Sequence, residues 1–203
     1  MHSHRKARLK YQGLGQQSLR IIAGNYRGRK LKSPPSLQTR PTSDRLRETL
    51  FNVLAPRIKG ARFLDLCAGS GAVGIEALSR GASQVTLVDQ SRKMCALIEA
   101  NLEALGVDEA EIEVVVAEAS VFLRRRAKRE GAPLDIIFFD PPYATDHEAV
   151  LDYVGGHAKL LADDGVMIVE HHRKDDLKEE FGEFKRYRVV KQGDSSLSFY
   201  EAS

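Results

Sequence analysis

The stretch that decides the fold is FLDLCAGSGAVG, residues 63–74. Its first half is a short apolar run of the kind that forms a buried parallel strand, and its second half is glycine-rich and leads into a helical pattern. Gly69, Gly71 and Gly74 have the spacing of the dinucleotide-binding turn. The stretch therefore predicts a Rossmann-like α/β fold that binds an adenosine-bearing cofactor; a tight turn without a ligand is the alternative.

Two acidic residues flank this turn and bear on the identity of the cofactor. Asp89 ends the second predicted strand, where an acid accepts hydrogen bonds from ribose hydroxyls. Asp65 lies inside the first strand, where a carboxylate would repel a pyrophosphate but can hold a sulfonium or an amino-acid moiety by charge. The pair favours S-adenosylmethionine over a nicotinamide dinucleotide.

Strand-like runs and helical patterns alternate around this stretch, which indicates a doubly wound sheet. The predicted parallel strands are residues 62–67, 84–88, 111–116, 134–139 and 165–170. After these, residues 185–190 and 197–200 are β-prone runs around a turn at 192–195, which predicts a terminal antiparallel pair. We therefore expect a mostly parallel seven-stranded sheet with terminal antiparallel strands.

The charge of the chain is divided unevenly. The 203-residue chain has a formal net charge of +3, but its first acidic residue is Asp44, and ten basic residues precede it. From residue 44 onward, 21 basic residues stand against 28 acidic ones. A polycationic end on an acidic body is typical of a catalytic domain with a nucleic-acid-binding arm. A solubilising tail and an organellar transit peptide are the alternatives.

The chain divides into three predicted segments. Residues 1–17 are expected to be a disordered basic tail. Residues 18–59 contain two β-prone runs around a turn, a proline linker and a helix start near Ser43, so a small basic hairpin and helix are expected there. Residues 60–203 are the expected cofactor-binding domain.

Composition argues against several other classes of protein. No apolar stretch approaches the roughly 20 residues that a membrane helix needs, and no signal-peptide core follows the N-terminal charges. Cys67 and Cys95 are the two cysteines, and they lack CxxC spacing, which argues against a disulfide framework or a zinc site. The histidines have no partners at metal-ligand spacing, so no metal is expected. A cytoplasmic setting fits these features.

A second motif, DPPY at residues 140–143, follows directly on the apolar run 134–139. It should therefore lie at the carboxyl end of a buried strand, where open α/β sheets bind ligands. The catalytic assignments are Asp140, Pro141, Pro142 and Tyr143. The prolines restrict the backbone, so that the Asp140 carboxylate and the Pro141 carbonyl can both accept from one exocyclic amino group. Tyr143 can stack on an extruded base, or it can pack in the core instead.

Five segments together resemble the successive signatures of the bacterial 16S ribosomal RNA guanine-N2 methyltransferases of the RsmD type. They are RIIAG at residues 20–24, RGRKL at 27–31, RPTSDRLRE at 40–48, FLDLCAGSG at 63–71 and DPPY at 140–143. The last two are shared by many amino-methylating enzymes, whereas RPTSDRLRE is much more specific to this family. The similarity extends from about residue 19 to the C-terminus.

The resemblance implies methyl transfer from S-adenosylmethionine to the exocyclic N2 amine of one guanine in 16S ribosomal RNA of the small ribosomal subunit. Residues 60–203 would then be a class I methyltransferase domain, and residues 18–59 an RNA-contacting extension. The residues expected to bind the cofactor are Asp65, Ala68, Gly69, Ser70, Gly71, Asp89, Gln90, Glu118, Ala119 and Asp140. Those expected to contact the RNA backbone are Arg27, Arg29, Lys30, Arg40, Arg45 and Arg47; a solvated basic face is the alternative.

One position departs from the family pattern. The family usually has Asp or Asn before Ala after the third strand, to meet the adenine amino group, whereas this chain has Glu118 before Ala119. Glu118 is one methylene longer. A carboxylate that stabilises a helix start through the helix dipole is the alternative.

Two rival functions share parts of the pattern. An adenine-N6 methyltransferase acting on DNA or RNA has the same glycine turn and DPPY motif, but this chain lacks room for the usual target-recognition domain of the DNA enzymes. A non-catalytic RNA-binding module for ribosome assembly is disfavoured by the intact Asp65, Gly69, Gly71, Asp89 and Asp140. A second basic cluster at residues 124–129 is interpreted as ordinary charged surface.

Overall fold

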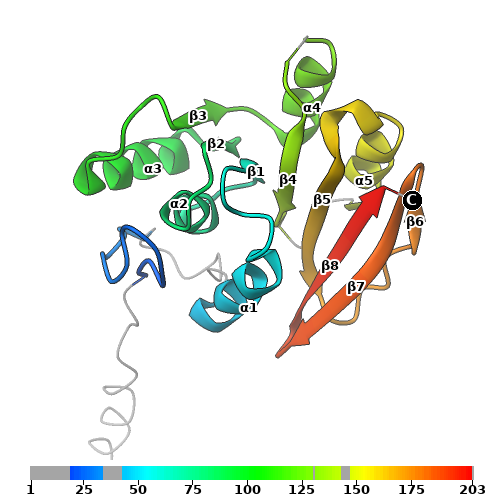
Figure 1. Cartoon of the computed structure of the whole chain (residues 1–203), viewed down its shortest axis with the longest axis horizontal. Helices are drawn as coiled ribbons and strands as arrows, with labels where there is room; N and C mark the ends of the chain where they lie inside the picture. Colours follow the sequence, from blue (N-terminus) through cyan, green and yellow to red (C-terminus); the bar gives the residue numbers. More distant parts are fainter. Residues whose placement is uncertain (1–18, 34–42, 130, 143–146, 203) are drawn as a thin grey trace, which may run out of the picture.

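One sheet runs through the centre of the molecule. The computed structural model describes residues 19–33, 43–129, 131–142 and 147–202. Within these ranges the sheet has eight strands in the order β3-β2-β1-β4-β5-β8-β7-β6 (Figure 1). The chain starts near the middle of the sheet, winds to one side and then continues on the other, which is the doubly wound topology.

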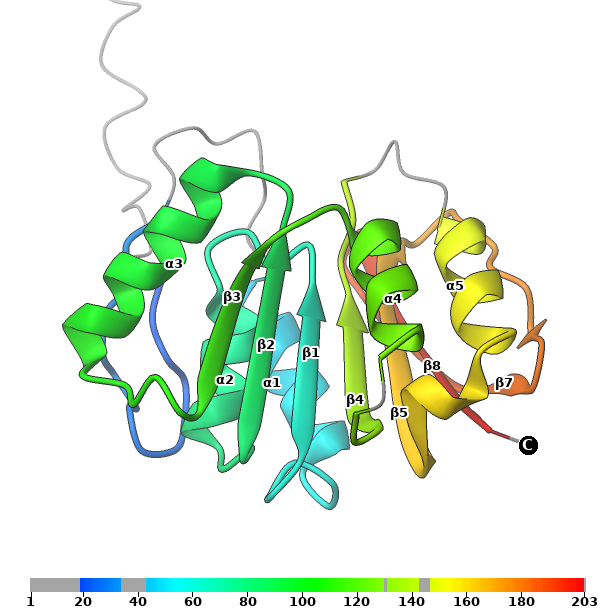
Figure 2. The same ribbon diagram turned by 90° about the horizontal axis from the view of Figure 1, so that it is seen from above.

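Five parallel strands form the part of the sheet that the glycine motif predicts. They are β1 (Arg62–Leu66), β2 (Gln84–Asp89), β3 (Ile112–Val116), β4 (Leu134–Phe139) and β5 (Leu161–His172). β1 pairs with β2 and β4, β2 with β3, and β4 with β5, all in parallel. In Figure 2 the arrowheads of β1, β2 and β4 point to the same side. This side is called the carboxyl edge below.

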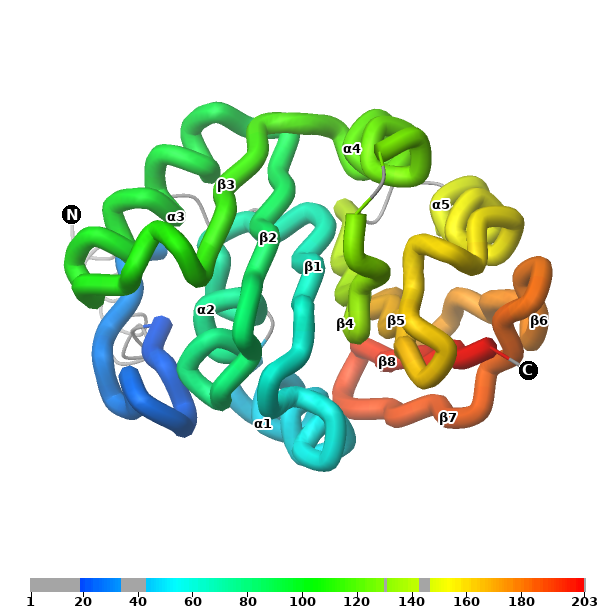
Figure 3. The backbone as a smooth tube through the Cα atoms, turned by 45° about the horizontal axis from the view of Figure 1, so that its top comes forward, coloured from blue at the N-terminus to red at the C-terminus, as the bar shows by residue number. Residues whose placement is uncertain are grey.

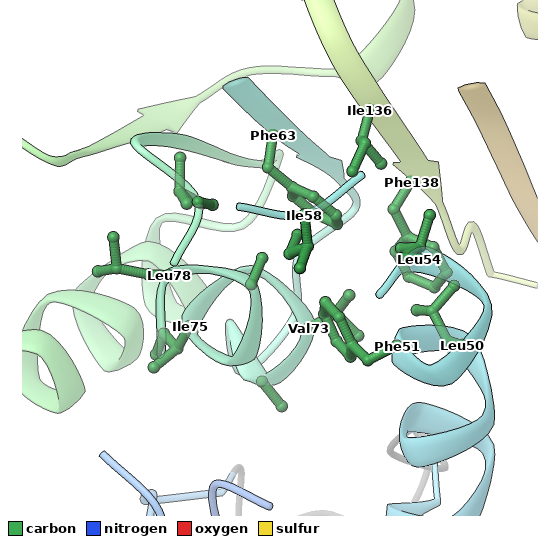
Figure 4. Close-up of a cluster of buried hydrophobic side chains, with 14 of the residues drawn as sticks. Leu50, Phe51, Leu54, Ile58, Phe63, Val73, Ile75, Leu78, Ile136 and Phe138 are labelled. Carbon is green, nitrogen blue, oxygen red and sulfur yellow. The ribbon is translucent and has the colours of Figure 1, made fainter. Parts of the chain in front are cut away.

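Helices cover both faces of the sheet. One apolar core contains residues of α1 (Asp44–Leu54), α2 (Ala72–Ser79) and α3 (Arg92–Leu105). The other contains residues of α4 (Ala119–Ala127), α5 (His147–Gly155) and the short 3-10 helix η1 (Ala158–Leu160). Figure 4 shows the first core, where Phe51 of α1 and Val73 of α2 lie close to Phe63 and Phe138 of the strands. Fully burying one such side chain contributes about 1.5–3 kcal/mol.

Local signals in the sequence set the helix ends. The Ser43 side chain caps α1 by accepting the N–H of Leu46 at 3.2 Å. Ser91 caps α3 by accepting the N–H of Met94 at 3.4 Å. α3 stops at Gly106, whose left-handed φ of 69° is typical of a glycine that ends a helix.

The end of the sheet is antiparallel, as predicted. β7 (Phe184–Gln192) and β8 (Ser195–Ala202) pair with each other, and β8 also pairs with β5. The predicted strand number of seven is wrong by one, because β6 (Glu180–Phe181) adds an eighth strand beside β7. Two residues are too few to show an alternating pattern, so the sequence gives no signal for β6.

Residues 19–33, called the hairpin below, form two short extended segments joined by a turn. Arg20 and Lys30 make an antiparallel bridge, and Leu31 donates its N–H to the carbonyl of Leu19 at 2.8 Å. Leu19, Ile21 and Leu31 are buried in the same core as α1, α2 and α3. The hairpin and α1 are therefore packed on the domain and share its core. The predicted tail, residues 1–17, lies outside the described residues.

None of the helices in the described ranges is long and apolar enough to cross a bilayer.

Candidate active site

The glycine turn, residues 68–71, leads from β1 into α2 at the carboxyl edge. Gly69 and Gly71 have φ values of 56° and 77°, in the left-handed region that side chains with a Cβ rarely adopt. A Cβ on Gly71 would also lie 3.1 Å from Cγ1 of Ile98 on α3. Cys67, just before the turn, has a φ of 65°, which for a residue other than glycine carries a strain of about 1–2 kcal/mol. The backbone is therefore held tightly where the cofactor is expected.

Asp65 is buried in β1 behind the turn. Its Oδ2 accepts the backbone N–H of Gly74, in the first turn of α2, at 2.9 Å. Burial raises the pKa of this carboxyl to about 7; the hydrogen bond from Gly74 lowers it, and the charge of Asp89 raises it. A positive charge brought near Asp65 would favour its ionised form.

Asp89 joins the end of β2 to the glycine turn. Its Oδ2 accepts the N–H of Gly69 at 2.9 Å, and its Oδ1 accepts the N–H of Ser91 at 2.8 Å. A carboxylate has about four lone-pair sites, so Asp89 can accept further hydrogen bonds, such as those from a pair of ribose hydroxyls. Gln90, the next residue, is exposed beside it.

The DPPY motif begins where β4 ends, as its sequence predicts. The N–H of Asp140 donates to the carbonyl of Leu66, the last residue of β1, at 3.4 Å. Pro141 is buried, whereas Pro142 is exposed. Tyr143 lies outside the described residues. The motif is thus placed next to the start of the glycine turn, and the stacking role of Tyr143 stays a prediction.

Four carboxylates, carried by the parallel strands or by residues that follow them, lie near Cys67 at this edge. The pKa of the Cys67 thiol is raised to about 12, first by burial and then by the negative charges of Asp89, Asp65, Asp140 and Glu118. These acids follow or belong to β1, β2, β3 and β4. The parallel sheet therefore brings together the acidic residues that the sequence analysis assigns to cofactor binding and to the DPPY motif.

Glu118 stands at the N-cap of α4, with Ala119 buried behind it. Its exposed carboxylate accepts from the Ser120 hydroxyl at 2.7 Å, and that hydroxyl accepts from Nη2 of Arg124 at 2.9 Å. The Glu118 side chain caps no helix N–H by a hydrogen bond. Both alternatives for Glu118 therefore stay open: a contact to the adenine amino group, or a negative charge that stabilises the start of α4.

The predicted RNA contacts on the hairpin face solvent. Arg27, Arg29 and Lys30 are exposed, and Arg29 donates from Nη2 to the carbonyl of Ala104 at the end of α3, at 2.7 Å. Arg45 on α1 is also exposed. Arg40 lies outside the described residues. The hairpin lies beside α2 and α3, as Figure 3 shows.

Arg47 corrects one of the predicted RNA contacts, because its side chain is 0% exposed. It lies 3.0 Å from Asp44 and 4.0 Å from Glu76, and it donates to the carbonyl of Arg20. Burial lowers the pKa of this guanidinium, while Glu76 and Asp44 raise it. Arg47 is therefore a structural ion-pair residue that connects α1, α2 and the hairpin.

Asn101 of α3 touches the site although the sequence analysis does not single it out. It is 2% exposed, and its Nδ2 donates to the carbonyl of Ser70 in the glycine turn at 3.3 Å. The signal that could have found it is a polar residue at a buried position of an otherwise apolar helix face.

An open groove of about 300 Å³ lies away from this edge. It is lined by the first residues of β1, β2 and β3, including Arg62, Gln84 and Ile112. These are the amino ends of the strands, so this groove is separate from the candidate site. Among the residues that the structure describes, no group of three His, Cys, Asp or Glu side chains is arranged to hold a metal ion.

Two relatives of this chain are named as ribosomal RNA methyltransferases. "Putative rRNA methyltransferase YlbH" of Bacillus subtilis is 36% identical over 183 residues, 90% of this chain and 98% of the relative. "Ribosomal RNA small subunit methyltransferase D" of Escherichia coli is 47% identical over 129 residues, which cover 64% of this chain and 62% of the relative. The alignment thus spans somewhat less than two thirds of the Escherichia coli protein.

A solved structure and a family model extend the similarity to nearly the whole chain. The structure described as "Putative methyltransferase yhhF from Escherichia coli" matches with a TM-score of 0.79 and 36% identity, covering 92% of this chain and 98% of that chain. The model of the family described as "Conserved hypothetical protein 95" matches residues 19–201. The chain therefore belongs to the conserved hypothetical protein 95 family, the RsmD-type family that its motifs predict.

Proposed function

We propose that this protein methylates 16S ribosomal RNA, transferring a methyl group from S-adenosylmethionine to the exocyclic N2 amine of a guanine. The names of its relatives support ribosomal RNA methylation as the activity. The guanine-N2 position is the finer part of the proposal and comes from the motif resemblance. The observation that carries the proposal is the convergence of Asp65, Asp89 and Asp140 around one loop at the carboxyl edge.

The chemistry of these side chains fits S-adenosylmethionine. When bound, this cofactor supplies a methyl group activated by a positively charged sulfonium. The buried Asp65 and the neighbouring acids provide negative potential for that charge and for the cofactor's amino group. Asp89 would hold ribose hydroxyls, and Glu118 or its helix start would lie beside the adenine. The glycine turn lets the backbone approach closely.

The catalytic task of the chain is mainly orientation. The lone pair of the guanine N2 is delocalised into the ring, so the amine is a weak nucleophile until it is held toward the methyl group. In our proposal, the Asp140 carboxylate and the Pro141 carbonyl accept the two amine hydrogens, and Tyr143 stacks on the extruded base. Such positioning can contribute about 7 kcal/mol or more, so a strong base is not required. Asp140 or water takes the proton that leaves the amine.

RNA is proposed to lie along the exposed basic side chains of the hairpin and α1. Arg27, Arg29, Lys30 and Arg45 present their charges to solvent. Arg40 belongs to the same proposed set, whereas Arg47 is excluded from it by burial. Phosphate contacts of this kind would position the subunit without reading its sequence.

Replacing Asp140 tests the catalytic assignment. In Asp140→Ala we expect methyl transfer to small ribosomal subunits to fall by about 100-fold or more, because a lost hydrogen bond to a developing charge is worth several kcal/mol. Binding of S-adenosylhomocysteine, measured by calorimetry, should change much less. Asp152→Ala, on the exposed surface of α5, is the matched control. Near-normal turnover in Asp140→Ala would refute the assignment.

A thermal-shift comparison separates the cofactor proposal from its rival. S-adenosylhomocysteine should raise the melting temperature of the protein, because a ligand that binds the folded state stabilises it. NAD should leave it unchanged. A shift with NAD alone would instead indicate a dinucleotide enzyme.

A further inference from the structure

We propose that Asn101 is a positioning residue that couples the hairpin to the glycine turn, so that binding of the cofactor orders the hairpin and an undocked hairpin weakens cofactor binding. This inference rests on the proposed function, which places the cofactor at the turn and RNA on the hairpin. It adds a physical connection between those two surfaces.

The Asn101 side chain makes hydrogen bonds to both segments. Its Oδ1 accepts the N–H of Lys32 at 2.8 Å, and its Nδ2 donates to the carbonyl of Lys32 at 3.2 Å. The same Nδ2 donates to the carbonyl of Ser70 at 3.3 Å. Lys32 lies at the end of the hairpin, and Ser70 lies in the middle of the glycine turn. One buried amide thus connects two segments that are 38 residues apart along the chain.

Only an asparagine side chain can satisfy this set of partners at this distance. The N–H of Lys32 requires an acceptor, while the carbonyls of Lys32 and Ser70 require donors, so the amide orientation is fixed by its partners. An aspartate would keep the first bond but would place negative charge against two carbonyl oxygens. An alanine would remove all three hydrogen bonds to the partly exposed backbone of Lys32 and Ser70.

The helix that follows the turn, α2, also holds the hairpin. Glu76 of α2 accepts the N–H groups of Ile22 and Ala23 at 2.7 and 3.0 Å. Ser79 of α2 accepts the N–H of Tyr26 at 3.0 Å through its hydroxyl. These contacts reach the hairpin but not the turn. They fix the hairpin on α2, whereas Asn101 is the side chain that contacts the turn as well.

The coupling follows from these contacts and is reciprocal. A cofactor that orders the Ser70 backbone also fixes the Asn101 amide and, through it, Lys32. By thermodynamic linkage, cofactor binding stabilises the contact with Lys32 by a certain factor, and release of Lys32 must weaken the affinity for the cofactor by that same factor. Since the exposed charges of the hairpin are the proposed RNA contacts, cofactor binding would prepare the surface that receives the RNA.

Hydrogen exchange on the full chain tests the coupling directly. With saturating S-adenosylhomocysteine, we expect amide exchange in residues 31–33 of the wild type to slow several-fold. In Asn101→Ala this protection should be lost, and the dissociation constant for S-adenosylhomocysteine, measured by calorimetry, should rise about tenfold. Asn101→Asp should weaken binding at least as much, although it is nearly isosteric.

Ser79→Ala is the matched control, because it loosens the hairpin without touching the glycine turn. It should speed exchange in residues 23–26 but leave the affinity for S-adenosylhomocysteine within about twofold of the wild type. A purely structural role for Asn101 would make the two variants alike in affinity, and this would overturn the coupling.

The wild-type exchange experiment decides the matter even when a variant does not fold. If S-adenosylhomocysteine binds and exchange in residues 31–33 is unchanged, the coupling is wrong while the methyltransferase proposal stands. If S-adenosylhomocysteine does not bind at all, the proposed function fails and the coupling fails with it.

Discussion

At the scale of single residues, Asp65 combines a functional position with a cost to stability. The carboxyl is buried and its pKa is raised to about 7, above the value of about 4 expected in the unfolded chain. Between these two values the native state binds more protons than the unfolded state. The contribution of Asp65 to stability is therefore fully present below about pH 4 and is lost as the pH rises toward about 7.

Asp65→Asn should reverse this loss. The amide can still accept the N–H of Gly74, but it carries no charge to bury. In the cofactor-free protein, the free energy of unfolding should therefore rise relative to the wild type by a few kcal/mol at about pH 8, and by much less at about pH 5. Urea unfolding at both pH values measures this difference. An equal effect at both would contradict the raised pKa, and tighter binding of S-adenosylhomocysteine would contradict the role of the charge.

The exposure of single charged residues could be predicted from the sequence where solvent surrounds them, but not where a distant partner buries them. RNA contact by the exposed residues stays a prediction. Arg27 and Lys30 lie in a turn-rich hairpin and are exposed. The sequence groups Arg47 with these residues as an RNA contact, although its side chain is buried. Its partner, Glu76, is on another helix, and no local pattern in the sequence reports that contact.

At the scale of elements, the docking of the hairpin depends on Glu76. This fully buried carboxylate accepts two hairpin N–H groups, bonds Nε of Arg80 at 2.7 Å and lies near Arg47. Glu76→Ala removes the acceptor of those two N–H groups, and it removes one of the negative charges beside the buried guanidinium of Arg47. The free energy of unfolding should fall by about 3 kcal/mol or more, as measured by urea denaturation.

The matched control for Glu76→Ala is Glu148→Ala, whose partner Lys178 lies on the surface. That exposed ion pair should be worth less than about 1 kcal/mol. Similar losses in the two variants would contradict the buried network as the attachment of the hairpin.

A second element-scale contact joins α5 to the β6–β7 turn. A Cβ at Gly155 would lie 2.2 Å from the backbone carbonyl oxygen of Phe181, which cannot move aside as a side chain would. Gly155→Ala should lower the free energy of unfolding by about 2 kcal/mol or more, because the helix must shift. Gly131→Ala, where a Cβ meets nothing within 4 Å, should be nearly neutral. Equal stability of the two variants would argue against the close approach.

The sequence predicted the elements of the parallel sheet well because their signals are local. Short apolar runs ended by Asp89 and Asp140 mark the strand ends, and the structure places both at the carboxyl edge. β6 and the last residues of β5 escaped prediction, because they pair with β7 and β8, which come later in the chain. The contact between Asn101 and Ser70 escaped because it joins two residues that are far apart in the sequence.

At the scale of the whole molecule, we propose that the basic hairpin binds RNA and that the acidic site binds the cofactor. Replacing Arg27, Arg29 and Lys30 together by glutamine should reduce the salt dependence of binding to small ribosomal subunits. The slope of log affinity against log salt should fall by about 2–3, since each phosphate contact releases counterions. Filter binding at several salt concentrations measures it.

The control for this charge variant is a glutamine triple variant at Arg124, Arg125 and Lys128. These residues lie at the end of α4, and α4 packs in the other core of the sheet. Their replacement should leave the slope unchanged. If the α4 variant reduced the slope of log affinity against log salt and the hairpin variant did not, the RNA would be assigned to the face of the sheet that α4 covers.

The most direct test of the central claim is mass mapping of nucleosides in 16S ribosomal RNA after incubation of small subunits with the protein and S-adenosylmethionine that carries an isotopically labelled methyl group. The account predicts labelled N2-methylguanosine at one position with the wild type, formed about 100-fold or more slowly with Asp140→Ala. Label in N6-methyladenosine, or an unlabelled RNA despite a bound cofactor, would contradict it.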